Sequence, residues 1–212
     1  GANIIRGITY QSFWPLLAIA AIVMLASCAK DNTSVEAQNA TLSFNVTSPA
    51  IATRYGEGTT ATKLYWATYD EQEGLISGLC GEKTFSLNTK VELSLVQGRT
   101  YEVIFWAQAE DAPYERAWGQ PGDAATEAKI NIVGIDDLKA NKESYDAFFH
   151  YTGKIEVSGS SILDVDLVRP FAQLNIATAD TAKAASAGFS AVATEVTVTA
   201  HSTLNLATGA VA

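Results

Sequence analysis

Few side chains in this sequence have the type and spacing that catalysis or metal binding requires. Its two histidines, His150 and His201, stand in unrelated contexts, and no Gly-x-Ser-x-Gly motif accompanies them. The spacings typical of zinc sites, His-x-x-x-His and Cys-x-x-Cys, are also missing from the sequence. We therefore predict no catalytic residue, no metal ligand and no cofactor, and we expect a protein that is not an enzyme.

Two pairs of carboxylates are the remaining candidates for acid–base chemistry. Asp136-Asp137 and the pair Asp164 and Asp166 could serve glycoside hydrolysis, and the second pair also offers oxygen ligands for calcium. Asp164 and Asp166, however, alternate with the apolar residues of the 163–167 segment. Because unpaired buried carboxylates are costly, this alternation predicts a strand whose acidic face lies in solvent.

The clearest chemical signal is Cys28 and the residues before it. An apolar run from Phe13 to Leu25 follows Arg6 and leads into Ala26-Ser27-Cys28. The run is too short to span a membrane and has the length of a secretion signal. Small residues before a cysteine resemble the bacterial lipobox, in which the signal is cleaved and the thiol is lipidated. A buried helix with a chance cysteine is the alternative.

We predict from this segment a cleaved signal peptide at residues 1–27 and an acylated Cys28, with palmitate among its acyl chains. More than one acyl chain gives stable anchoring, so the expected location is the outer membrane and cell surface. The polar segment 28–40 lacks periodicity and is expected to be a flexible tether. The remaining residues, 41–212, are expected to form the folded domain.

Composition limits the possible partners. The chain has 212 residues, 48% of them hydrophobic, which is enough for a packed core. Its formal net charge is −9, and it has no dense run of lysine and arginine to neutralise phosphates. Nucleic-acid binding is therefore not expected.

Alternation of apolar and polar residues recurs along residues 41–212 and predicts an all-β domain. Leu42, Phe44 and Val46 share one strand face. Two further strands around the turn Gln97-Gly98-Arg99 read as a hairpin spanning Val91–Ala107. The other expected elements are strands with Leu64 and Trp66 on one face and Tyr65, Ala67 and Tyr69 on the other, strands at Ile130–Val133 and Ile155–Val157, helices at Ile135–Lys142 and Ala179–Ala187, and a long loop from Ala112 to Ala125. Without a βαβ rhythm, this pattern indicates a sandwich.

Aromatic residues are frequent and allow two interpretations. Most of them fall inside the alternating strands, where large side chains fill a sandwich core. Tyr114 and Trp118 lie in the long loop instead. They are the candidates for an exposed platform that would bind host or microbial glycans or proteins.

Several segments together resemble the fimbrillin-type lipoproteins of Bacteroidetes. The lipobox is followed by the blocks that carry this resemblance, which are Ala40–Val46, Ala52–Gly58, Lys63–Asp70, Tyr101–Gln108, Tyr145–Phe149, Val168–Asn175 and Leu204–Gly209. The resemblance covers most of residues 41–212. It identifies the broad family and does not select a member.

This resemblance implies a transthyretin-like or Ig-like antiparallel β-sandwich and a structural or adhesive role in a fimbria. In such pilins an Arg-specific protease removes the first strand, and a strand from another subunit fills the resulting groove. The matching site here is Arg54-Tyr55, for which an ordinary surface arginine is the alternative. Anchor subunits of the family stay lipidated and uncleaved. Family pilins have a second domain that supplies the donor strand, so we expect either a second domain after residue 212 or a single-domain relative that receives a strand without donating one.

Overall fold

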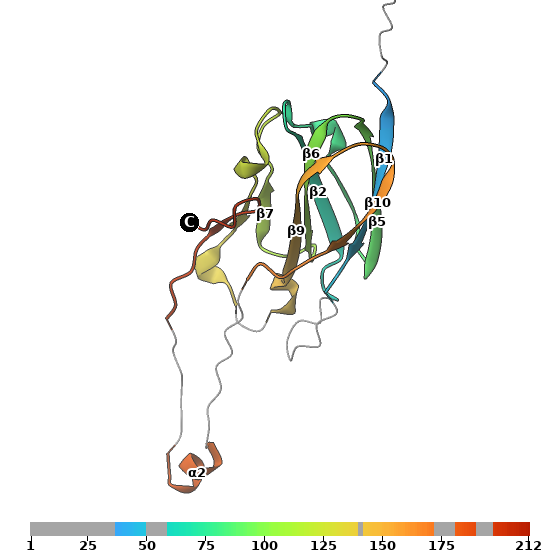
Figure 1. The fold of residues 1–212 in the computed structure, drawn as a ribbon. Coiled ribbons are helices and arrows are strands. Elements are labelled where there is room, and N and C mark those ends of the chain that lie inside the picture. Colours follow the sequence, from blue (N-terminus) through green and yellow to red (C-terminus); the bar gives the residue numbers. More distant parts are fainter. Residues whose placement is uncertain (1–36, 50–58, 140–141, 172–180, 190–196) are drawn as a thin grey trace, which may run out of the picture. The chain divides into compact units, whose positions relative to one another are not determined.

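The computed structural model describes residues 37–49, 59–139, 142–171, 181–189 and 197–212 (Figure 1). Its strands are β1 Asn39–Thr47, β2 Lys63–Asp70, β3 Gly74–Leu75, β4 Gly81–Thr84, β5 Asn88–Val96, β6 Thr100–Gln108, β7 Tyr114–Ala117, β8 Lys129–Ile132, β9 Ala147–Glu156, β10 Ser161–Asp166 and β11 Thr203–Asn205. Its helices are α2 Thr181–Ser186 and the 3-10 turns η1 Ser77–Leu79, η2 Ala125–Glu127, η3 Ile135–Asp137 and η4 Glu143–Tyr145.

The strands form three sheets. The first sheet has the order β10-β1-β5, and the second has the order β3-β2-β6-β9 with β4 also paired to β2. The third sheet, β11-β8-β7, lies against the other face of the second. The predicted all-β sandwich is confirmed, with a third layer that the sequence pattern did not indicate.

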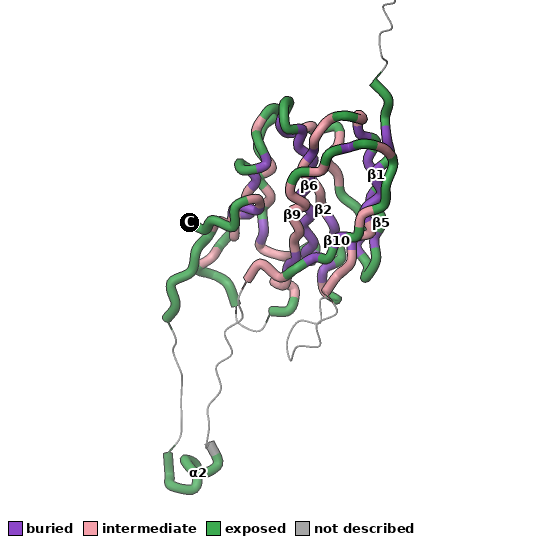
Figure 2. Tube along the Cα trace, viewed as in Figure 1, coloured by how far each residue is buried: buried purple, intermediate pink, exposed green. Residues whose placement is uncertain are grey.

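Two apolar clusters hold the layers together. The first cluster joins β1, β5 and β10 to the inner face of β2 and β6, with Phe44 and Phe105 at its centre. The second cluster joins the opposite face of β2 and β6 to β7 and β8, around Trp106 and Tyr114. In Figure 2 the buried positions follow β1, β2 and β6. The second sheet is therefore covered on both faces.

Burial on both faces explains the unusually apolar sequence of β6. Tyr101, Val103 and Phe105 belong to the first cluster, whereas Ile104 and Trp106 belong to the second. A strand covered on both faces needs apolar residues at every position rather than at alternate ones. The two predicted faces of β2 are likewise confirmed, because Leu64 faces the first cluster and Ala67 and Tyr69 face the second.

The predicted hairpin over Val91–Ala107 is wrong. β5 pairs with β1, and β6 pairs with β2 and β9. At the intervening turn the backbone N–H of Gln97 donates to the backbone carbonyl of Gln38 (2.8 Å). The backbone N–H of Gly98 donates to the backbone carbonyl of Val157 (2.7 Å). The turn thus carries the chain from the first sheet to the second, with Gly98 at a φ of 80° that suits glycine. Alternation shows that two segments are strands but not whether they pair.

One pairing departs from the antiparallel arrangement expected for the sandwich. β10 runs parallel to β1, from Leu42 opposite Ser161 to Thr47 opposite Asp166. The direction of β10 depends on where the chain arrives from β9, and the side chains of β10 carry no signal of it. The predicted solvent exposure of Asp164 and Asp166 is confirmed.

Other expected boundaries differ in the structure. The expected loop of residues 112–125 contains the strand β7, which pairs with β8. The expected helix at 135–142 appears in the described residues as the short turn η3, whereas α2 lies within the expected helix at 179–187. β9 is much longer than the predicted 155–157 segment, and β1 begins at Asn39, inside the segment expected to be tether. Among the described residues, no helix has the length and apolar character needed to cross a bilayer.

Candidate functional site

The candidate site is the position that β1 occupies between β5 and β10, here called the β1 slot. β1 pairs with both neighbours over most of its length, antiparallel to β5 and parallel to β10. Its inward side chains are almost completely buried, with Leu42 1% exposed and Phe44 and Val46 0% exposed. The Phe44 ring lies 5.3 Å from that of Phe105 in the second sheet. β1 is therefore both the middle strand of its sheet and a wall of the first cluster.

The side of β1 that faces away from the first cluster is held by side-chain hydrogen bonds to both neighbours. Ser43 Oγ donates to Glu92 Oε1 of β5 at 3.3 Å. Asn45 Nδ2 donates to Asp164 Oδ1 of β10 at 3.0 Å, and Thr47 Oγ1 donates to Asp166 Oδ1 at 2.6 Å. Each outward side chain of this stretch is thus a donor, and each partner is a carboxylate.

Without β1 the first sheet would lose its continuity. β5 and β10 have no direct pairing with each other, so both would present unpaired backbone groups toward the empty slot. The apolar side chains that face β1, including Phe105 and Val165, would also lose their cover. An emptied slot would therefore bind another extended strand through the same groups that hold β1.

Three predicted site residues cannot be compared with this geometry. Cys28, Arg54 and Tyr55 lie outside the described residues. In the sequence Cys28 precedes β1 and Arg54 follows it. β1 is therefore the strand that connects the predicted anchor to the predicted cleavage site.

Tyr114 and Trp118 lie on the third sheet and the loop after it, and they differ in exposure. Tyr114 is 8% exposed, and its hydroxyl donates to the Tyr145 carbonyl. Its ring stacks on Phe171 at 5.3 Å and meets the edge of Trp106 at 5.6 Å. Trp118 is half-buried. Tyr114 thus belongs to the second cluster, which leaves Trp118 as the accessible part of the predicted platform, and glycan binding there stays a prediction.

Three tyrosines are expected to ionise late in an alkaline titration. Burial raises the pKa of Tyr69 and Tyr114, and burial together with the hydrogen bond to Glu102 raises the pKa of Tyr151 to about 12. Each folded-state pKa lies above the unfolded value near 10. The folded state therefore keeps its full stability toward ionisation of these tyrosines below about pH 10, and it loses stability as pH rises from there through the folded pKa. Tyrosinate absorbance should rise in a late phase that coincides with unfolding. A single transition near pH 10 in folded protein would contradict this expectation.

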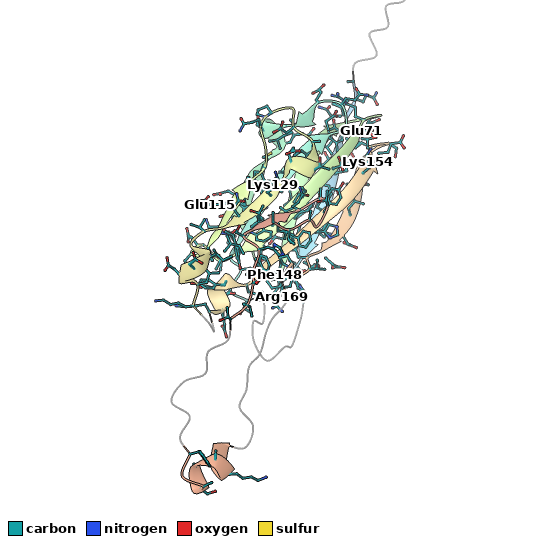
Figure 3. All side chains as sticks on the ribbon, turned by 90° about the vertical axis from the view of Figure 1, so that its left-hand side faces the viewer. Glu71, Glu115, Lys129, Phe148, Lys154 and Arg169 are labelled. Carbon is teal, nitrogen blue, oxygen red and sulfur yellow. The ribbon has the colours of Figure 1, made fainter. Side chains whose placement is uncertain are left out.

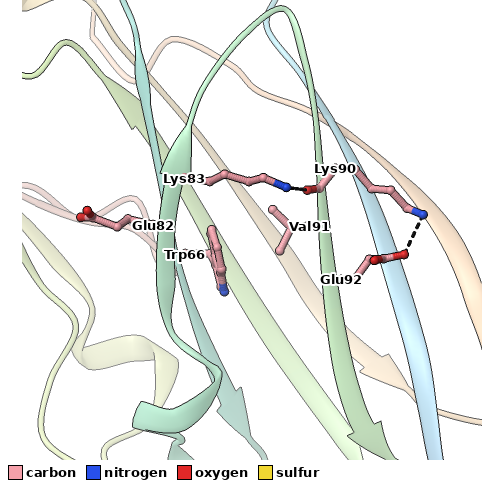
Figure 4. A pocket seen from close by; sticks show the side chains of 6 residues that line it. All are labelled: Trp66, Glu82, Lys83, Lys90, Val91 and Glu92. Atoms are coloured by element: carbon pink, nitrogen blue, oxygen red, sulfur yellow. Dashed lines mark hydrogen bonds and ion pairs between the residues drawn. The ribbon is translucent and has the colours of Figure 1, made fainter.

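A shallow cleft of about 430 Å³ lies between the outer edges of β4 and β5 (Figure 4). It is lined by Trp66, Glu82, Lys83, Lys90, Val91 and Glu92. Lys83 Nζ donates to the Lys90 carbonyl at 3.0 Å, and Lys90 Nζ lies 2.6 Å from Glu92 Oε1. That lysine lowers the pKa of Glu92 through its hydrogen bond and charge. The sequence predicted that Trp66 lies in the core, whereas in the structure it lines this cleft beside β5. Alternation of apolar and polar residues does not reveal such a contact.

His150 and Cys80 are side chains of reactive types, and each contacts a backbone oxygen of the fold. His150 Nδ1 lies 2.9 Å from the Asp166 carbonyl oxygen. Cys80 is half-buried, and burial raises the pKa of its thiol, which disfavours the reactive thiolate. Within the part of the chain that the structure describes, no three residues of the types His, Cys, Asp and Glu are grouped to hold a metal ion.

The model of a family of unknown function, DUF6562, matches residues 32–212. No curated protein matches the chain.

Three solved structures share parts of the fold. The fimbrial anchor protein Mfa2 from Porphyromonas gingivalis is 10% identical with a TM-score of 0.44, covering 62% of this chain and 50% of its own. A candidate polysaccharide-binding protein from Bacteroides thetaiotaomicron is 16% identical with a TM-score of 0.43, covering 61% and 47%. A candidate adhesin from Bacteroides ovatus is 13% identical with a TM-score of 0.41, covering 62% and 45%. This chain thus spans about half the length of each.

Proposed function

This chain belongs to the family of unknown function DUF6562, and we propose that it is a non-enzymatic, lipid-anchored subunit of a cell-surface fimbria that assembles by β-strand donation. Its partners are other fimbrial subunits, whose strands take the place of β1. Its anchor is the acylated Cys28. This anchor holds the subunit at the outer membrane until cleavage, or permanently if the subunit is not cleaved. Residues 55–212 form the part of the domain that receives the strand.

The observation that carries this proposal is the position of β1 in both the chain and the fold. A strand at the edge of a sheet can be removed at little cost in stability, because it pairs with one neighbour only. β1 instead lies between β5 and β10 and contributes Leu42, Phe44 and Val46 to the first cluster. A cut at Arg54 would separate this strand from the rest of the domain while leaving its binding groove in the larger fragment.

The order of the sequence features supports the same proposal. A cut at Arg54 would also separate the domain from Cys28, because both β1 and the anchor precede that residue. One cleavage would therefore release the subunit from its lipid and free the slot for another strand. An uncleaved molecule would keep its slot filled and stay at the membrane, as an anchor subunit would.

Mass spectrometry of the protein from its natural host tests this proposal. We expect a membrane-bound form that begins at an acylated Cys28 and an assembled form that begins at Tyr55. The variant Arg54→Lys keeps the positive charge but removes the residue that an Arg-specific protease recognises. It should therefore accumulate as the acylated form and be missing from fibres. The matched control is Arg116→Lys, a change of the same kind at a partly exposed arginine in β7, which should leave both forms in place.

Two results would overturn the proposal. The first is an unmodified Cys28 with the leader still attached, because the anchor would then not exist. The second is assembly of Arg54→Lys into fibres at the wild-type level with residues 28–54 retained in them, because β1 would then stay in its slot.

A further inference from the structure

Beyond the exchange itself, we infer that three carboxylates beside the β1 slot select which strand may enter it. These are Glu92 of β5 and Asp164 and Asp166 of β10, here called the acceptor row. The inference rests on the proposed strand exchange and adds the chemistry of the partner. The partner strand carries hydrogen-bond donors at the alternate positions that face away from the first cluster, and no acidic residue opposite Asp164 or Asp166.

The register of β1 places one donor opposite each member of the acceptor row. Ser43 lies opposite Glu92, Asn45 lies opposite Asp164, and Thr47 lies opposite Asp166. All three pairs are hydrogen-bonded, at 3.3, 3.0 and 2.6 Å. The strand that now fills the slot therefore shows the pattern that the slot accepts.

An ionised carboxylate explains the preference for donors. It has no hydrogen to donate, so it interacts favourably with hydroxyl, amide or ammonium groups and repels another carboxylate. Asp164 and Asp166 are exposed and near the β1 side chains, so an acidic residue there would face a like charge directly. Serine, threonine, asparagine and lysine would each satisfy the row.

The inward face of the slot discriminates less than the acceptor row. Its requirement is an apolar residue at every second position, as Leu42, Phe44 and Val46 supply. Nearly every half-buried strand of a sandwich meets this requirement, because alternation is the general pattern of such strands. Discrimination among subunit strands must therefore come from the outward positions.

Peptide capture by a cut domain tests the inference. The starting protein contains the tether and the domain, residues 28–212. In it the segment between Ala50 and Gly58 is replaced by the recognition site of a site-specific protease, so that cutting does not depend on Arg54. The cut protein is incubated with an excess of labelled peptide Gln38–Ser48. A peptide with Thr47→Asp is compared with one bearing Thr41→Asp, a matched control because Thr41 is exposed and lies opposite Ser94 rather than an acid.

We expect the Thr47→Asp peptide to be captured about 2- to 30-fold more weakly than the native peptide, since it loses a favourable pair and gains a repulsive one. The Thr41→Asp peptide should bind within about 2-fold of the native one. In the protein variant Asp166→Lys the order should reverse, with Thr47→Asp bound more tightly than the native peptide.

The possible failures are distinct. Failure of the native peptide to enter the cut domain would refute strand exchange and the proposed function with it. Capture of all three peptides with equal affinity would leave strand exchange in place and refute selection by the acceptor row. The same would follow if Asp166→Lys left the order of the peptides unchanged.

Discussion

Replacing Phe44 by alanine is expected to lower the free energy of unfolding by about 3–5 kcal/mol, the range for a fully buried aromatic side chain. The Phe44 ring is 0% exposed and packs against Phe105 at 5.3 Å. It lies at the centre of β1, in the middle of the first sheet, so the cavity left by its removal cannot be filled by movement of a free edge. Urea denaturation followed by circular dichroism measures the loss.

The matched control for this substitution is the next residue along β1. Asn45→Ala removes an outward side chain whose hydrogen bond to Asp164 is exposed to solvent, so it should cost about 0.5–1 kcal/mol. A loss for Phe44→Ala no larger than that for Asn45→Ala would show that β1 does not anchor the first cluster. The difference matters for function, because weaker packing of β1 should also speed its replacement by another strand.

Replacing Arg169 by alanine is expected to destabilise the domain by about 2 kcal/mol, between the values for an exposed ion pair and for a fully buried one. Its guanidinium binds Asp146 at two points, with Nε to Oδ1 and Nη2 to Oδ2 both at 2.6 Å. The two side chains are 18% and 9% exposed, and the Arg169 guanidinium also lies 5.4 Å from the ring of Phe148 (Figure 3). The substitution would leave the half-buried Asp146 carboxylate without this partner.

An ion pair of the same length on the surface is the matched control. Lys154 Nζ lies 2.6 Å from Glu71 Oε1, but the two side chains are 61% and 48% exposed (Figure 3). Lys154→Ala should therefore cost about 0–1 kcal/mol, because water screens and replaces such a contact. Thermal or urea denaturation of both variants compares them directly. Equal losses would mean that burial does not set the strength of the Arg169–Asp146 pair.

Local patterns in the sequence were sufficient for several of the strands and their faces, β1 and β2 among them. Leu42, Phe44 and Val46 face inward because side chains of a strand alternate between its two faces, and this periodicity is visible without a partner. The outward position of Asp164 and Asp166 follows from the same alternation and the cost of burying a charge. The continuous apolar run of β6 was visible too, but its cause, a third sheet over the second, was not.

The partners of the strands could not be read in the same way. β5 was predicted to pair with β6 because a turn joins them, yet its partner is β1. Backbone hydrogen bonds hold any two extended segments with little regard to side chains, so pairing depends on how the whole chain is routed. Tyr114 was predicted in an exposed loop for a related reason, because the cover that Phe171 and Trp106 place on its ring comes from distant segments.

The sequence by itself predicted an anchor at Cys28 and, after it, a strand with one apolar face, and the family resemblance added a predicted cleavage site at Arg54. The first two are patterns of neighbouring residues, so the sequence is enough to recognise them. Only the tertiary structure decided that this strand lies between β5 and β10 and that Glu92, Asp164 and Asp166 meet its outward donors. Asn45 and Asp164 are distant along the chain, and the folding of everything between them is what brings the two side chains to 3.0 Å.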